Sequence, residues 1–274
     1  MRSIYSYWSF DFITIAFILF LCLFYLYIIK FHLQKQSLNF LAGIFLLLLC
    51  VCSPLHFIGE NYLFSIHMLT HTIILLIAAP LLVAGVPKNN RFRKAFFSFS
   101  KKTHHAPFVC WLTGVMIMWI WHVPAIFNHL FMPGMMPMEM HHMNALSYFH
   151  MLSLLVAGMV FCLPIINPYS SCRISPASGV LYLTSACVFC SLLGLLITFA
   201  PQGIYTHYTN IQDMYGFLPM IRNDWNISAA TDLQAGGLIM WVPCCFIYLT
   251  ASMVLLIKWL ENKSESPAVP VINL

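Results

Sequence analysis

The chain has 274 residues, of which 61% are hydrophobic and only 8% are charged. Soluble globular domains carry roughly 25% charged residues, so this composition excludes a water-exposed surface over most of the chain and indicates one that faces lipid. The net charge of +5 at pH 7 does not point to nucleic-acid binding, because the basic residues are confined to particular loops.

Apolar segments of membrane-spanning length predict an all-α, polytopic membrane protein. A helix needs ~20 mostly apolar residues to cross the bilayer core, and seven segments meet this requirement: 12–29, 39–57, 62–86, 107–131, 146–168, 178–200 and 233–258. The first segment ends at Lys30 without a small-residue cleavage pattern, so we interpret it as a retained helix and not a signal peptide. We expect one seven-helix transmembrane domain over residues 1–260 and a short, disordered cytoplasmic tail over 261–274.

The distribution of basic residues predicts the orientation. One set of loops contains only Arg2 and Arg222, whereas the other set contains eleven basic residues: Lys30, Lys35, Lys88, Arg91, Arg93, Lys94, Lys101, Lys102, Arg173, Lys258 and Lys263. The positive-inside rule then places the N-terminus outside and the C-terminus in the cytoplasm, which agrees with an odd number of helices. We interpret the stretch from Lys88 to Lys102 as an orienting loop beside anionic lipid, with a protein-binding patch as the alternative.

Histidines gather near the predicted outer end. His67 and His71 are four residues apart early in the third helix, so both face the same way. His122 lies roughly 22 Å along the fourth helix at ~1.5 Å per residue, His150 begins the fifth, and Asp232 begins the seventh. Ionisable residues are costly in a membrane, so four helices contributing such residues at one depth predict a metal or cofactor site. Hydrogen-bonded structural histidines are the alternative.

Sulfur surrounds these histidines. Met68 is next to His67, and thioethers together with imidazoles favour Cu(I), whereas thiolates oxidise more readily outside the cell. The loop between the fourth and fifth helices is unusually rich in methionine and histidine, with Met132, Met135, Met136, Met138, Met140, His141, His142 and Met143. We predict copper binding in this loop, with an interfacial segment lying on lipid as the alternative.

The ten cysteines do not predict a disulfide framework, because nine of them lie inside apolar segments and only Cys172 lies in a loop. Cys187 and Cys190 are three residues apart in the sixth helix and share a face, which suits a soft relay. Inert, apolar cysteines are the favoured interpretation. Pro124 follows His122 closely and is expected to break the fourth helix beside the site, unless it is an ordinary membrane-helix proline.

Five stretches in order resemble the CtaG family of cytochrome c oxidase assembly factors: 67–71 with 79–87, 121–127, His150 with 157–168, 198–205, and 232–243. The resemblance implies a bacterial inner-membrane protein that matures a haem–copper oxidase by delivering copper, as Cu(I), at the outer face. Its implied partners are cytochrome c oxidase subunits, membrane lipid and a periplasmic copper donor. The ligands that we expect from the depth and spacing of the residues are His67, His71, His122 and His150, with Met68 and Asp232 beside them.

Two other functions remain open on the residues alone: a copper transporter, and a b-type haem protein that uses pairs of these histidines. An enzyme is not expected, because the chain shows no nucleophile–base set and its carboxylates are few and scattered.

Overall fold

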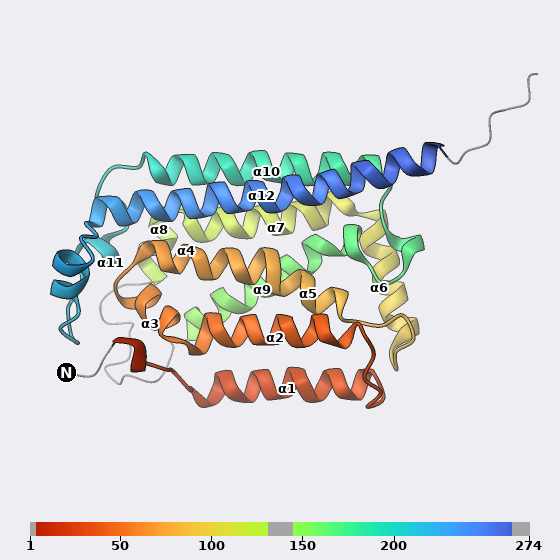
Figure 1. Cartoon of the computed structure of the whole chain (residues 1–274), viewed down its shortest axis with the longest axis horizontal. Coiled ribbons are helices and arrows are strands. Elements are labelled where there is room, and N and C mark those ends of the chain that lie inside the picture. The colour runs from red at the N-terminus through yellow and green to blue at the C-terminus, as the bar shows by residue number, and fades with distance from the viewer. Residues whose placement is uncertain (1–3, 131–144, 265–274) are drawn as a thin grey trace, which may run out of the picture.

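A computed structural model describes residues 4–130 and 145–264, and it contains helices and no strands within those ranges. The long helices run roughly parallel to one another along the longest axis of the molecule (Figure 1). Each of the seven predicted segments corresponds to helix: α1 (Phe12–Ile28), α2 (Ser37–Cys52) with α3 (Pro54–Asn61), α4 (Phe64–Ile73) with η2 (Ile74–Ala78) and α5 (Ala79–Ala84), α7 (Pro107–His122), α9 (Ala145–Ile166), α10 (Pro176–Thr198) and α12 (Ala229–Ser264).

Length and apolar composition qualify four of the described helices to cross a membrane: Phe64–Ala84, Leu146–Ile166, Pro176–Thr198 and Ala229–Glu261. The pair α2 and α3, bent by 47° at its break, counts as a fifth if it forms one span. The apolar helices α1 and α7 are shorter, with 17 and 16 residues. The structure therefore supports a membrane protein with four or five candidate spans.

Two of the predicted segments, 39–57 and 107–131, are each broken by a proline. Pro54 begins α3, and the Ser53 hydroxyl accepts a hydrogen bond from the Leu55 N–H at 3.2 Å. Val123 is extended (φ −62°, ψ 122°), as the residue before a proline tends to be, and Pro124 begins α8 (Pro124–Leu130). The break expected at Pro124 is thus confirmed, and it makes His122 the last residue of α7.

The stretch from Lys88 to Lys102, predicted as a loop, is largely helical and forms α6 (Arg93–His105). Its aromatic residues provide an apolar face: Phe96 packs on the small core around Val83, and Phe97 meets the Tyr169 ring at 5.2 Å. The basic side chains are left exposed. The element lies at the end of the bundle opposite α3, α8 and α11 (Thr206–Thr209) (Figure 1).

Glycines bring α4, α9 and α12 close together. A Cβ added at Gly236 of α12 would lie 2.4 Å from the Phe64 ring of α4, and one added at Gly158 of α9 would lie 2.6 Å from the Leu75 carbonyl oxygen. Both distances are too short for any other residue without a shift of the neighbouring helix. These close approaches place the first turn of α4 beside α12, and η2, which continues from α4, beside α9.

Short elements cover the end of the bundle that contains α3: η1 (Ile4–Ser6), α8, α11 and η4 (Met220–Asp224). Ile4, Tyr62, Phe217 and Ile221 pack there in a second apolar cluster, and the Tyr62 hydroxyl donates to Asp213 at 2.8 Å. At the other end lie α6 and η3 (Ser170–Cys172), and α12 extends through Ser264, beyond the predicted start of the tail. All ten cysteines are free thiols.

Candidate metal centre

Three histidines from two helices meet in the interior. His67 and His71 lie one turn apart on α4, with ring centroids 4.1 Å apart. His150, in the second turn of α9, faces them, with its ring centroid 4.6 Å from that of His71 and 5.8 Å from that of His67. Each of the three offers a ring nitrogen within 4.8 Å of the others. We call His67, His71 and His150 the histidine trio.

All three side chains are almost completely inaccessible to solvent, with exposed fractions of 0%, 1% and 2%. Neither ring nitrogen of His71 has a hydrogen-bond partner among the described residues, and the same holds for Nε2 of His150. A buried polar atom without a partner costs ~1–3 kcal/mol, and in native proteins such atoms are usually satisfied by an ion or a water molecule. These histidines therefore fit a metal ion.

His122 and Met68 lie beside the trio. Nδ1 of His122 is 2.6 Å from the Met118 carbonyl oxygen, so a neutral ring donates its proton there and presents a lone pair at Nε2. That nitrogen is 3.1 Å from the Met68 sulfur, and the His122 ring is 5.7 Å from the His71 ring, centroid to centroid. Two electron-pair donors facing each other are stabilised by a soft cation between them.

Glu60 is a functional candidate that the sequence did not single out. Its Oε1 is 3.1 Å from Nδ1 of His67, which directs Nε2 of that ring toward the trio. A carboxylate behind a histidine ligand fixes the ring and strengthens it as a donor. The proline break before α3 and the turn between α3 and α4 produce this contact, and neither is visible in the spacing of seven residues between Glu60 and His67.

Groups from α11 hold Glu60 in place. Nε2 of His207 contacts the Glu60 carbonyl oxygen at 2.7 Å, and the Tyr208 hydroxyl donates to the Gly59 carbonyl oxygen at 2.5 Å. Burial lowers the pKa of His207 below its ordinary value, so this ring stays neutral near pH 7. Aromatic side chains complete the enclosure, because Phe64 stacks on Tyr205 at 4.7 Å and Phe127 packs 5.5 Å from the His67 ring.

Asp232, which we had grouped with the metal ligands, is placed differently. Its carboxylate accepts hydrogen bonds from the Phe64 N–H at 2.8 Å, the Ser65 N–H at 3.0 Å and the Ser65 hydroxyl at 2.6 Å. The first turn of α4 has no side-chain cap of its own at Leu63, so α12 supplies one. Among the described residues, Asp232 does not join the trio, and its contacts are those of a helix cap.

The other predicted copper ligands, Met135, Met136, Met138, Met140, His141 and His142, lie outside the described residues. The elements on either side of them are α8 and α9, and His150 lies in the second turn of the latter.

Replacing Asp232 tests its role as the cap. We expect Asp232→Ala to lower stability by ~1–3 kcal/mol, because three buried donors lose their acceptor, and Asp232→Asn to lower it less, since the amide keeps one acceptor oxygen. The measurement is thermal unfolding in detergent, with the exposed Gln234→Ala on the same helix as the control. An Asp232→Ala variant as stable as the control would contradict the assignment.

The family described as cytochrome c oxidase caa3 assembly factor (Caa3_CtaG) matches residues 31–262, which include every helix from α2 to α11, α12 as far as residue 262, and all of the histidines described above. No curated protein and no solved structure matches the chain. Because the match extends over most of its length, the chain belongs to the family of cytochrome c oxidase caa3 assembly factors.

Proposed function

We propose that this chain binds Cu(I) at the histidine trio and delivers it to a caa3-type cytochrome c oxidase while that oxidase is being assembled. The observation that carries the proposal is the meeting of three buried imidazoles within 4.8 Å, with the Met68 thioether and His122 beside them. Family membership supports the oxidase as the destination. The chain acts as an assembly factor and not as an enzyme.

The charges around the site favour a monovalent ion. Neutral imidazoles and a thioether bring no charge, and Glu60 is the carboxylate that contacts the trio, through His67. A buried charge is tolerated when it is paired, so one Cu(I) balances one Glu60 carboxylate. A divalent ion would leave one positive charge without a carboxylate in contact with the trio, because the Asp232 carboxylate lies at the start of α4, where it accepts from Phe64 and Ser65.

The same geometry disfavours haem. His67 and His150 are the trio members farthest apart, at 5.8 Å between ring centroids, but His71 lies 4.1 Å and 4.6 Å from them. A porphyrin plane between His67 and His150 would therefore collide with His71. A single ion needs only that the ring nitrogens converge, which they do.

We further propose that the chain crosses the bacterial inner membrane seven times, with the N-terminus and the histidine trio toward the outer face. The helices α1 and α7 run alongside the longer helices (Figure 1), and the basic helix α6 lies at the opposite end from α3 and α8. In this topology the Met- and His-rich segment connects α8 to α9 on the outer side. It would receive copper from a periplasmic donor and pass it to the trio.

The copper site is tested by measuring bound Cu(I) after loading under reducing conditions. His71→Ala should lower the bound metal by about one ion per chain, because it removes the central ligand. Glu60→Gln should keep the stoichiometry but weaken affinity roughly 10–100-fold, the usual cost of losing a residue behind a ligand. His32→Ala, an exposed histidine at the opposite end, is the matched control. Unchanged copper in His71→Ala would refute the site.

The topology is tested with reporter fusions. A fluorescent protein fused after Glu261 should be bright, because the end of α12 is placed in the cytoplasm. Alkaline phosphatase fused after Gln202, between α10 and α11, should be active, because that loop is placed outside. The opposite pattern, with phosphatase active after Glu261, would reverse the proposed orientation.

A further inference from the structure

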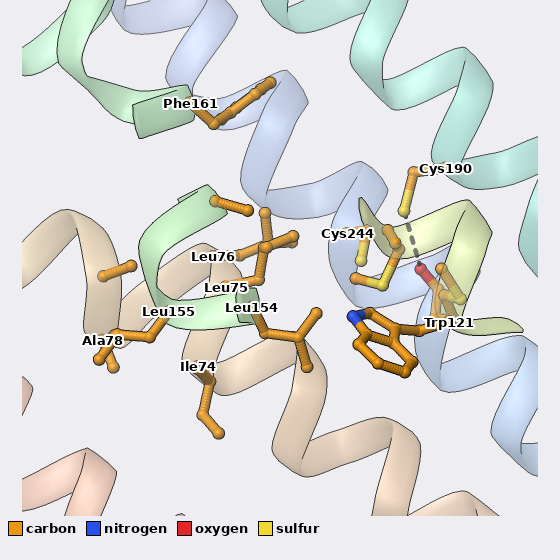
Figure 2. Close-up of a cluster of buried hydrophobic side chains, with 14 of the residues drawn as sticks. Ile74, Leu75, Leu76, Ala78, Trp121, Leu154, Leu155, Phe161, Cys190 and Cys244 are labelled. Atoms are coloured by element: carbon orange, nitrogen blue, oxygen red, sulfur yellow. Dashed lines mark hydrogen bonds between the residues drawn. The ribbon is translucent and has the colours of Figure 1, made fainter. Parts of the chain in front are cut away.

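Four of the ten cysteines gather where α10 packs against α12. Cys187, the middle residue of α10, and Cys190 lie one turn apart on the same face of that helix, and Cys244 and Cys245 are adjacent on α12. The Cys187 thiol donates to the Cys245 sulfur at 3.4 Å, and the Cys190 thiol donates to the Met240 carbonyl oxygen at 3.6 Å. Figure 2 shows Cys190 and Cys244 close to each other, so four thiols gather at this interface.

We propose that these four cysteines form a second Cu(I) site, separate from the histidine trio and nearer the middle of the bundle. Thiols are the softest ligands that a protein offers and select Cu(I). Taking a metal–sulfur bond of ~2.3 Å, two sulfurs 3.4 Å apart subtend an angle of roughly 95° at an ion between them. That angle suits two neighbouring ligands of a three- or four-coordinate ion, and the pair Cys190 and Cys244 supplies the remaining donors after a small movement.

Binding of Cu(I) to these buried thiols with loss of one proton leaves the net charge unchanged, which suits their apolar surroundings. One Cu(I) replaces the proton of one thiol, and that proton leaves to solvent, so the ion is held by one thiolate and by neutral sulfurs. The net charge of the cluster stays zero, which avoids the cost of an unpaired buried charge. Serine assists at one edge: the Ser191 hydroxyl donates to the Cys187 carbonyl at 2.7 Å, so its oxygen accepts from Cys245 at 3.0 Å.

Close packing alone does not account for the cluster. Small residues allow membrane helices to approach each other, and Gly194 and Gly237 serve that purpose at the same interface, where a Cβ on Gly194 would lie 2.8 Å from the Gly237 carbonyl oxygen. Four thiols gathered at one interface are not needed for that purpose. The bland interpretation, in which buried cysteine acts as a small apolar residue, predicts no response to Cu(I).

Met118 lies between the two sites. Its carbonyl oxygen accepts the hydrogen bond from Nδ1 of His122, and Met118 lines a small cavity together with Cys190 and Tyr248. Cys190 also contacts the Met240 carbonyl oxygen at 3.6 Å, which is drawn in Figure 2. The thiol cluster therefore begins about where the surroundings of His122 end, and it offers a place in which an ion is stored next to the delivery site.

The test uses the full chain in detergent and Cu(I) itself as the probe. In a His71→Ala/His150→Ala background, which lacks the trio, we expect about one Cu(I) per chain, with sulfur neighbours in its X-ray absorption spectrum. Adding Cys187→Ser/Cys245→Ser should abolish that binding. The matched control is Cys22→Ser/Cys50→Ser, which likewise alters one half-buried and one buried thiol. Unchanged melting temperatures show that all variants are folded.

The outcomes separate this proposal from the proposed function, on which it does not rest. Loss of one ion in the trio variant with a second ion retained on sulfur supports both sites. Equal copper in the Cys187→Ser/Cys245→Ser variant and in its control overturns the thiol site and leaves the trio standing. An intact mass showing a Cys187–Cys245 disulfide in the protein purified without reductant overturns it too, because the pair would then serve redox chemistry.

Discussion

The first turn of α4 has unpaired backbone N–H groups and no capping side chain of its own, and it begins inside a bundle that faces lipid. Backbone donors left without partners in such surroundings are costly. The Asp232 carboxylate of α12 removes that cost by accepting from Phe64 and Ser65. This one contact fixes how far α4 extends and how it is rotated, and His67 and His71 follow within its next two turns. The position of the histidine trio therefore depends on a helix cap supplied from 168 residues away.

Two of the clustered histidines, His67 and His122, are oriented by groups that lie behind their rings. Glu60 contacts Nδ1 of His67, and the Met118 carbonyl contacts Nδ1 of His122. The neighbouring nitrogens are thereby turned toward the interior. The Trp121 ring lies 4.6 Å from the His150 ring, centroid to centroid. Its indole N–H donates to the Ser153 hydroxyl at 2.8 Å, which holds the Trp121 ring against His150. The ring nitrogens of the trio therefore converge within 4.8 Å of one another, as the proposed Cu(I) site requires.

The sequence predicted the helical class, the seven apolar segments and the histidines that meet, because each follows from hydropathy or helical periodicity. His67 and His71 share a face by spacing alone, and His150 was placed near them by its depth. The features that the sequence did not predict depend on the direction that the chain takes after a helix is interrupted. The bend at Pro54 brings Glu60 behind His67. Helical periodicity in the sequence does not predict this contact. Asp232 was grouped with the metal site because it lies at the right depth, and depth alone does not reveal that its carboxylate accepts from Phe64 and Ser65 at the start of α4.

The cysteines also show that contacts between helices are not predicted by the spacing of residues within one helix. Cys187 and Cys190 share a face by spacing, but helical periodicity does not reveal that Cys244 and Cys245 lie opposite them, because the pairing of α10 with α12 depends on tertiary packing. The helix α6 was not predicted, because we interpreted its many basic residues as a loop and gave little weight to the apolar face that Phe96 and Phe97 provide.

The central claim is that the histidine trio binds copper through imidazole. X-ray absorption at the copper edge of the Cu(I)-loaded Cys187→Ser/Cys245→Ser variant tests it most directly, because the thiol pair is then absent. The account predicts a coordination shell dominated by nitrogen at about 2.0 Å with imidazole scattering beyond it, and with at most one longer sulfur bond from Met68. A shell without nitrogen, or no bound copper in a folded protein, would contradict it.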